Sequence, residues 1–173
     1  MTTFAITALG VSSAAGVGVA SLGAAVAEKR SCLAPLPPAL ASGLPVTFGA
    51  RAHFHEGDDR AMALAEGALR ELLAGAKLDA HTLEQTGLAL GTGLGAMERS
   101  EAFLRKATDE GASKTLLPHS LTCELAERHG LGGPMGTYTV TCVSALYALE
   151  QACAEVALGR APAMICGGVE TLS

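Results

Sequence analysis

Short apolar runs alternate along the chain with segments that have the hydrophobic spacing of a helix. Residues 60–76 carry one apolar face at i, i+3 and i+4 positions, which predicts an amphipathic helix capped by Asp58. Residues 87–91 read Gly-Leu-Ala-Leu-Gly, a continuous apolar run that predicts a strand buried on both faces. Strands followed by helices predict a mainly parallel sheet with helices on both sides, so the fold class is α/β.

The alternation of apolar runs and helical spacing also predicts the elements in the rest of the chain. Residues 31–57 are rich in proline and lack periodicity, which predicts a loop with at most a short strand at 46–48. Gly130 and Gly159 stand where two helices are expected to end. The expected strands are 4–9, 87–91, 137–141 and 162–166, and the expected helices are 19–30, 60–76, 96–108, 118–129 and 143–158.

Length and charge narrow the class of protein. The 173 residues suffice for one domain with a sizeable core, so we expect residues 1–173 to form a single unit. Hydrophobic residues make up 49% of the chain and aromatic residues 3%, which favours closely packed helices and strands over an aromatic binding surface. The formal net charge is −5 and there is no cluster of Lys or Arg, so a nucleic-acid partner is not expected.

The cysteines indicate a reducing compartment. Their number is odd and none forms a C-x-x-C pair or a zinc-type Cys/His spacing, so we expect neither a disulfide framework nor a metal site. Residues 1–27 carry no charge, but they lack a basic start and glycines and serines interrupt them. A signal peptide or membrane span is therefore not expected, and the predicted location is the cytoplasm. The five cysteines are Cys32, Cys123, Cys142, Cys153 and Cys166.

One cysteine lies at a junction that can change its chemistry. The strand expected at 137–141 delivers Cys142 to the first turn of the helix expected at 143–158. The free N–H groups and the positive dipole end of a helix favour the thiolate, which is the nucleophilic form. The apolar neighbours oppose this effect, because burial disfavours a charge. Small residues at Ser144 and Ala145 leave room for a substrate carbonyl. Packing of Cys142 as a buried small hydrophobe is the alternative interpretation.

Five motifs in the same order resemble the N-terminal half of a β-ketoacyl synthase, a condensing enzyme of fatty-acid and polyketide synthesis with a thiolase-like fold. The resemblance covers almost the whole chain. It implies one half of an αβαβα layered fold with a mainly parallel five-stranded sheet. The motifs are Ile6–Gly16 (opening strand and turn), Asp59–Ala65 (first long helix), Gly91–Gly95 (glycine-rich loop), His129–Pro134 (approach to the nucleophile strand) and Gly159–Glu170 (following strand).

The resemblance also implies roles for two residues. The family's nucleophile motif usually reads Thr-Ala-Cys-x-Ser-Gly, and Cys142 matches its cysteine, which accepts an acyl group as a thioester. Val140, Thr141 and Ala145 depart from that motif, and Ala145 could crowd the acyl chain. Leu94 matches a position that helps to bound the acyl pocket in related enzymes, although ordinary loop packing explains it equally well.

The family's two catalytic histidines lie in its C-terminal half, and the five histidines of this chain do not match them. The resemblance therefore implies that a second polypeptide with a C-terminal half supplies them, in an obligate complex. An acyl carrier protein is the implied donor of the acyl chain, dimerisation through the nucleophile strand is plausible, and no cofactor is implied. The histidines of this chain are His53, His55, His81, His119 and His129.

Three other readings remain open. A non-catalytic partner similar to a chain-length factor would fit the altered motif, but such subunits typically lack the cysteine. A dinucleotide site is suggested by Gly91-x-Gly93-x-x-Ala96, but Asp109 and Glu110 lie in a polar turn where a second strand should end. The chain could also be a degenerate relative without activity.

Overall fold

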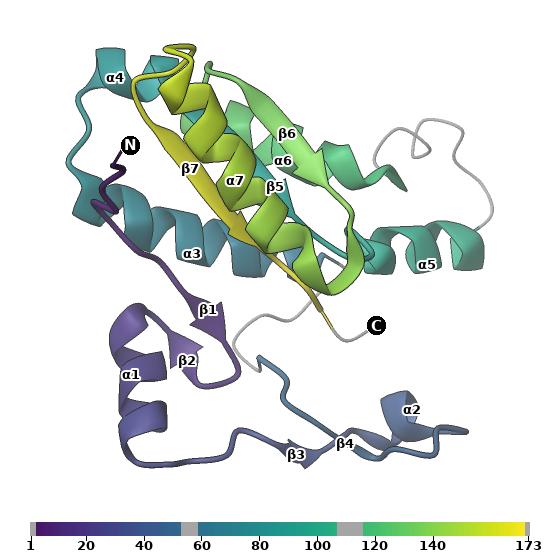
Figure 1. Ribbon diagram of the computed structural model, residues 1–173. Helices are drawn as coiled ribbons and strands as arrows, with labels where there is room; N and C mark the ends of the chain where they lie inside the picture. The colour runs from purple at the N-terminus through teal and green to yellow at the C-terminus, as the bar shows by residue number, and fades with distance from the viewer. Residues whose placement is uncertain (1–2, 53–58, 107–115, 172–173) are drawn as a thin grey trace.

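The computed structural model describes residues 3–52, 59–106 and 116–171 (Figure 1). In chain order the elements are β1 (Ser12–Ser13), β2 (Gly16–Val17), α1 (Val19–Ala27), β3 (Ala34–Pro35), α2 (Pro38–Ala41), β4 (Phe48–Gly49), α3 (Arg60–Ala76), α4 (Ala80–Gln85), β5 (Gly87–Gly91), α5 (Met97–Lys106), α6 (Pro118–His129), β6 (Met135–Tyr138), the 3₁₀ turn η2 (Thr141–Val143), α7 (Ser144–Ala157) and β7 (Met164–Gly168).

A parallel sheet with the order β6-β5-β7 forms the centre of the molecule. Every residue of β5 is buried, as its uninterrupted apolar sequence predicts for a central strand. Leu88 of β5 is level with Met135 of β6 and with Ile165 of β7. Helix α7 covers one face of this sheet, while α6 and α3 lie on the other (Figure 1). The α/β class and helices on both faces are therefore confirmed.

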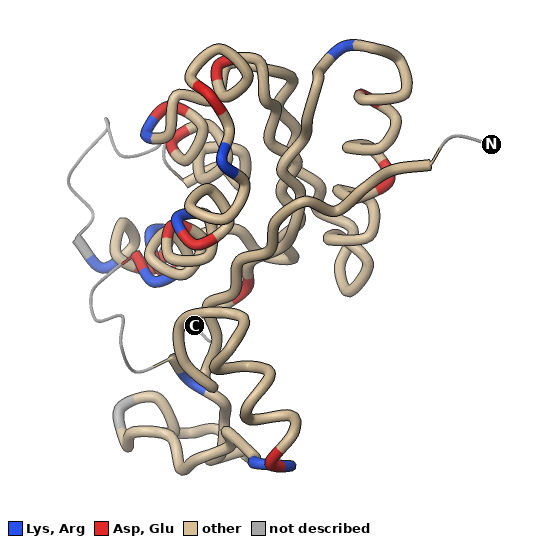
Figure 2. The backbone as a smooth tube through the Cα atoms, turned by 90° about the vertical axis from the view of Figure 1, so that its left-hand side faces the viewer, with Lys and Arg blue, Asp and Glu red and all other residues tan. Residues whose placement is uncertain are grey.

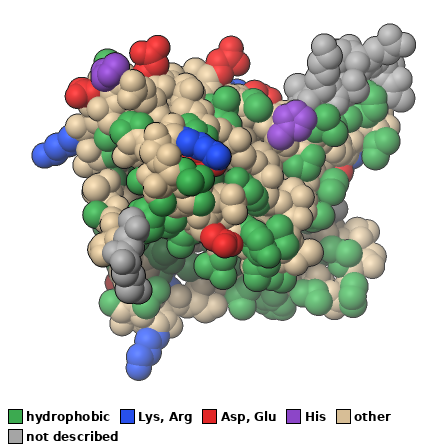
Figure 3. Space-filling model, turned by 45° about the horizontal axis from the view of Figure 1, so that its top comes forward, with side chains coloured by type: hydrophobic (Ala, Val, Ile, Leu, Met, Phe, Trp, Pro, Cys, Tyr) green, Lys and Arg blue, Asp and Glu red, His purple; other side chains and the backbone are tan. Residues whose placement is uncertain are grey.

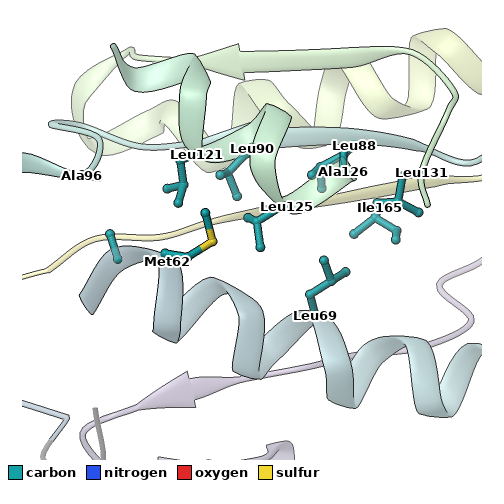
Figure 4. Close-up of a cluster of buried hydrophobic side chains, with 11 residues drawn as sticks. Met62, Leu69, Leu88, Leu90, Ala96, Leu121, Leu125, Ala126, Leu131 and Ile165 are labelled. Carbon is teal, nitrogen blue, oxygen red and sulfur yellow. The ribbon is translucent and has the colours of Figure 1, made fainter. Parts of the chain in front are cut away.

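The main hydrophobic core lies between the sheet and the pair α3 and α6 (Figure 4). Leu121 and Leu125 of α6 are almost completely buried and meet Met62 and Leu69 of α3. On the opposite face the buried cluster consists of Ala89, Ala148 and Ala152, and Tyr138, Met164 and Cys166 pack against it while partly buried. Alanines let α7 approach the sheet closely, and the large fully buried apolar residues lie on the other side.

The helix ends follow the expected capping chemistry with one shift. Asp59, rather than Asp58, caps α3, and its Oδ1 accepts a hydrogen bond of 3.4 Å from the Met62 N–H. Asp58 lies outside the described residues. Gly130 ends α6 in the left-handed conformation with φ 67°, and Gly159 follows α7 with φ 68°, so both glycine stops are confirmed.

The five-stranded sheet expected from the resemblance is not what the described residues form. Their parallel sheet has three strands, and two short antiparallel pairs, β1-β2 and β3-β4, stand apart from it. The strand expected at 4–9 is absent, because a strand exists only where another strand accepts its hydrogen bonds, and β7 pairs only with β5. The short strand expected at 46–48 is found at Phe48–Gly49 instead.

Residues 3–52 form a separate layer next to α3. Gly10 lies against the α3 backbone so closely that an added Cβ would be 1.9 Å from the Ala68 carbonyl oxygen. The Glu71 carboxylate accepts hydrogen bonds from the N–H groups of Val11 (2.8 Å) and Val19 (2.9 Å), so it joins this layer to α3 and caps α1. In Figure 2 the charged residues gather mainly on the helices of the main body, whereas residues 31–50 carry none.

Two strand boundaries differ from the pattern by two or three residues. The strand expected at 137–141 is β6, Met135–Tyr138, and the strand expected at 162–166 is β7, Met164–Gly168. Along the described part of the chain, none of the helices combines the length and the hydropathy needed to cross a membrane.

Candidate active site

Cys142 lies in η2, the single 3₁₀ turn that connects β6 to α7. Its side chain is exposed, so the buried-filler interpretation does not describe its place in this structure. The sequence predicts Cys142 in the first helical turn, and the structure places it two residues before Ser144, where the 14-residue α7 begins. Cys142 therefore stands at the positive end of this helix, where an anion is favoured.

The residue before Cys142 has a strained backbone. Thr141 has φ 50°, in the left-handed region that a β-branched residue seldom occupies. Such a conformation costs on the order of 1–3 kcal/mol, and it persists only where surrounding contacts hold it. Strained positions of this kind cluster at functional sites, so Thr141 draws attention to the cysteine that follows it.

Ser144 supplies the contacts that hold this turn. Its side chain is buried, with 4% exposed, and its Oγ accepts a hydrogen bond of 2.8 Å from the Val140 N–H. The same hydroxyl lies 2.7 Å from the Thr141 carbonyl oxygen and 3.2 Å from the Thr92 carbonyl oxygen, so it can donate to either. Ser144 therefore closes the turn and also connects it to the loop after β5.

The start of α7 packs directly on the ends of β5 and β7. A Cβ added to Gly91 would lie 2.4 Å from the Ala145 nitrogen, so glycine is needed for this approach. A Cβ added to Gly168 would lie 2.9 Å from the Cβ of Ala145. The methyl group of Ala145, the departure expected to crowd an acyl chain, thus lies against β7. Three small residues bring the candidate nucleophile to the carboxyl edge of the sheet.

The glycine-rich loop after β5 lies beside the turn. Thr92 is buried; its N–H donates to the Tyr138 carbonyl at 3.0 Å, and its Oγ1 accepts from the Gly95 N–H at 2.9 Å. The Gly93 N–H donates to the Glu170 carboxylate at 2.6 Å. Leu94, the predicted acyl-pocket residue, is 56% exposed in this loop. It is therefore available for contact, and its role stays a prediction.

Two residues of this arrangement were not singled out as site residues from the sequence. Thr92 and Glu170 both lie within quoted motifs, but no periodicity or spacing predicts that they hold the same loop. Glu170 acts through a contact distant in the sequence, since 77 residues separate it from Gly93, whereas the Thr92 side chain bonds Gly95 within the loop. A buried threonine directly after a central strand was the one available signal, because buried hydroxyls need hydrogen-bond partners.

None of the described histidines is hydrogen-bonded to Cys142. His129 ends α6 with its Nε2 3.2 Å from the Glu66 Oε1, and His81 contacts Gln85 within α4. His119 is exposed near the start of α6. His53 and His55 lie outside the described residues. The described part of the chain thus presents a thiol without a hydrogen-bonded imidazole.

A metal site and a cavity are the other two features that could supply chemistry within the described residues. They contain no group of three or more His, Cys, Asp or Glu side chains arranged to hold a metal ion. A cavity of about 410 Å³ opens between the N-terminal layer and the chain after β7, and its lining includes Ser12, Arg51 and Glu170. Neither Cys142 nor Leu94 lines this cavity. Asp109 and Glu110, which the dinucleotide hypothesis needs, lie outside the described residues.

Comparisons with known proteins agree with this geometry. The family described as "Beta-ketoacyl synthase, N-terminal domain" matches residues 45–173. Nodulation protein E of Rhizobium meliloti (strain 1021) is 28% identical over 182 residues, which cover 94% of this chain and 45% of that protein. The 3-oxoacyl-[acyl-carrier-protein] synthase 2 of Staphylococcus aureus is 31% identical over 121 residues, which cover 65% of this chain and 30% of that protein.

A solved structure gives the same result for the fold. The ishigamide ketosynthase/chain length factor superposes with a TM-score of 0.85 and 27% identity, over 97% of this chain and 52% of that one. The chain spans about half the length of the relatives that it matches. The family match over most of the chain, with this superposition, shows that the chain belongs to the β-ketoacyl synthase family through its N-terminal domain.

Proposed function

We propose that Cys142 accepts an acyl chain as a thioester from an acyl carrier protein, before a decarboxylative Claisen condensation. In this step the Cys142 thiolate attacks the acyl carbonyl, a new carbon–sulfur bond forms and the carrier's thiolate leaves. The catalytic histidines come from a second polypeptide with the C-terminal half of a synthase. The pathway is of the fatty-acid or polyketide type.

The position of Cys142 is the single observation that carries this proposal. The side chain is exposed, it stands at the positive end of a 14-residue helix, and it follows the strained Thr141. A helix N-terminus stabilises the thiolate, and exposure gives a thioester access to it. Kinship with a 3-oxoacyl-[acyl-carrier-protein] synthase supports the same chemistry, since that relative is named for making an acyl group on an acyl carrier protein.

Two features support a separate supplier of the proton-handling groups. His129 is hydrogen-bonded to Glu66, and none of the described histidines is hydrogen-bonded to the Cys142 thiol. Exposed apolar side chains lie on α7, including Leu146, Tyr147 and Leu149, where a second body could bury them. Figure 3 shows hydrophobic side chains spread over the forward face with few charges between them. Exposed apolar surface of this kind supports an interface with a second polypeptide.

Leu94 has a defined place in the proposal. It belongs to the glycine-rich loop, which Ser144 connects to the nucleophile turn and Glu170 connects to the segment after β7, and it is 56% exposed. We propose that Leu94 bounds the acyl chain once the second polypeptide covers this loop. Exchange of Leu94 for Ala then changes the preferred acyl length without changing the labelling of Cys142.

Site-specific labelling tests the nucleophile. An electrophilic acyl mimic is added to the assembled complex at neutral pH, and intact-protein and peptide mass spectrometry locate the adduct. Cys123 is the matched control, because it is also exposed but lies within α6 rather than at a helix start. We expect labelling at Cys142 at least about tenfold faster than at Cys123, because a helix N-terminus enriches the thiolate. Equal rates would contradict the proposal.

Expression tests the complex. The chain produced alone should associate or precipitate through its exposed apolar surface, and co-expression with a synthase C-terminal half should give a soluble heteromer on size-exclusion chromatography. A soluble, well-folded monomer from this chain alone would contradict an obligate complex.

A non-catalytic scaffold is the second candidate. The altered residues around Cys142 favour it, and so does the similarity to a ketosynthase/chain length factor structure. Absence of any adduct at Cys142 in the assembled complex, together with normal assembly, would select this function over the first.

A further inference from the structure

We infer that Ser144 is a positioning residue for the nucleophile, and that its hydroxyl holds Cys142 at the start of α7. This inference rests on the proposed function for its consequence, but its evidence is the geometry of the turn alone. Sequence reasoning treats Ser144 only as a small residue that leaves space for substrate, whereas the structure buries its side chain and gives it three polar neighbours.

The hydrogen bonds of Ser144 close a loop of five residues around Cys142. The Val140 N–H, on the strand side of the cysteine, donates to the Ser144 Oγ at 2.8 Å. The hydroxyl can donate back across the turn to the Thr141 carbonyl oxygen at 2.7 Å, the shorter of its two acceptor distances. Residues before and after Cys142 are therefore joined through one side chain, and Cys142 occupies the bend between them.

These hydrogen bonds of the Ser144 hydroxyl, here called the Ser144 clamp, also account for the strained backbone at Thr141. A β-branched residue with φ 50° relaxes toward extended or helical backbone unless other contacts oppose this change. The Ser144 hydroxyl bonds the carbonyl of that very residue, and the Val143 N–H donates to the Val140 carbonyl at 3.2 Å. Loss of the hydroxyl removes two contacts that hold the strained conformation.

The third neighbour fixes the clamp to the sheet. The Thr92 carbonyl oxygen lies 3.2 Å from the Ser144 Oγ, and Thr92 is itself held by its N–H bond to Tyr138 at the end of β6. The start of α7 cannot shift toward β5, because Gly91 leaves no space there even for a methyl group. Ser144 thus sets the Cys142 turn relative to both neighbouring strands.

The test measures the rate of Cys142 alkylation by iodoacetamide at neutral pH, on the full 173-residue chain in complex with a synthase C-terminal half. We expect Ser144→Ala to slow alkylation by about tenfold, since Cys142 is then no longer held at the helix end. Ser144→Thr keeps a hydroxyl and should retain the wild-type rate, while Cys123 should react unchanged in both variants. A wild-type rate in folded Ser144→Ala would overturn the inference.

A second variant covers the case in which Ser144→Ala does not fold. Thr141→Gly removes the strain, because glycine adopts positive φ freely, so the double variant Thr141→Gly/Ser144→Ala should fold. Slow alkylation in the double variant, with a wild-type rate in Thr141→Gly alone, supports the inference, and wild-type rates in both variants overturn it.

Acyl transfer from a small acyl thioester is measured in parallel and separates this inference from the proposed function. An absence of transfer in the wild-type complex, with alkylation that still depends on Ser144, contradicts only the function. Transfer and alkylation that are both insensitive to Ser144→Ala contradict only the positioning role.

Discussion

The sheet unit of residues 59–106 and 116–171 and the N-terminal layer of residues 3–52 differ in how many of their apolar side chains they bury. In the sheet unit Leu121 and Leu125 are essentially fully buried, and α3, α6 and β5 share one core. In the N-terminal layer Ala25 is the one buried hydrophobic residue described, while Ile6 is 79% exposed. The sheet unit therefore has a core of its own, although Leu146, Tyr147 and Leu149 of α7 remain exposed. The N-terminal layer has apolar residues whose burial requires another surface.

The attachment of the N-terminal layer follows the same division. The close approach of Gly10 to α3 and the two hydrogen bonds of Glu71 join the layer to the sheet unit. Both joints involve main-chain atoms of the layer, so they position it without burying large side chains. The comparison indicates that stability resides in the sheet unit, and that the N-terminal layer is available for assembly.

The largest expected effect is in the core. Leu121→Ala should lower the free energy of unfolding by about 2–5 kcal/mol, because it leaves a cavity at a fully buried position. The same exchange at Leu33, which is 64% exposed, should change it by less than about 0.5 kcal/mol. Urea unfolding followed by circular dichroism measures both variants. Similar losses of unfolding free energy in the two variants would show that the N-terminal layer has a core of its own, which would contradict the difference drawn between the two regions.

An intermediate effect on stability is expected at Glu71, which joins the N-terminal layer to α3. Glu71→Ala should remove about 1–2 kcal/mol of local stabilisation, since it leaves the N–H groups of Val11 and Val19 without their carboxylate acceptor. Amide hydrogen exchange should show faster exchange in α1, with the protection of β5 unchanged. Loss of protection in β5 as well would mean that the two regions unfold together.

The smallest effect is a pH dependence within the sheet unit. Burial alone would raise the pKa of Glu66, but the hydrogen bond from Arg70 and the charges of His129 and Arg70 outweigh it, so the pKa lies below its usual value. A lowered pKa in the folded state means that Glu66 stabilises the fold above its unfolded-state pKa and loses this contribution as the pH falls through the folded-state pKa. We therefore expect the free energy of unfolding to decline modestly below about pH 4.5.

Substitution of Glu66 isolates its contribution to the pH dependence of stability. Glu66→Gln should flatten the decline between pH 6 and pH 3, whereas Glu127→Gln, on the exposed face of α6, should leave it in place. Urea titrations at each pH provide the measurement. An unchanged slope in Glu66→Gln would assign the dependence to other carboxylates.

Regions with strong periodicity were predicted closely. The residues of α3, β5 and α6 coincide with their predictions, because their apolar positions and capping residues are local signals. The strand predicted at 4–9 is wrong for the described structure, because an apolar run shows a tendency to be buried and does not supply a hydrogen-bond partner. The position of Cys142 at the start of a helix was predictable, since a β-branched run ends there and an Ala/Leu-rich segment begins.

The sequence by itself determined the α/β class, the main helices and the placement of a cysteine at a strand–helix junction. These features depend on neighbouring residues and on periods of two or 3.6, which a single chain displays directly. Tertiary structure alone decided the sheet order, the clamp of Ser144 on Thr141 and Thr92, and the bond from Gly93 to Glu170. Strand order and the contacts that join distant segments arise only when the elements meet in space, and a local pattern contains no information about which partners they will find.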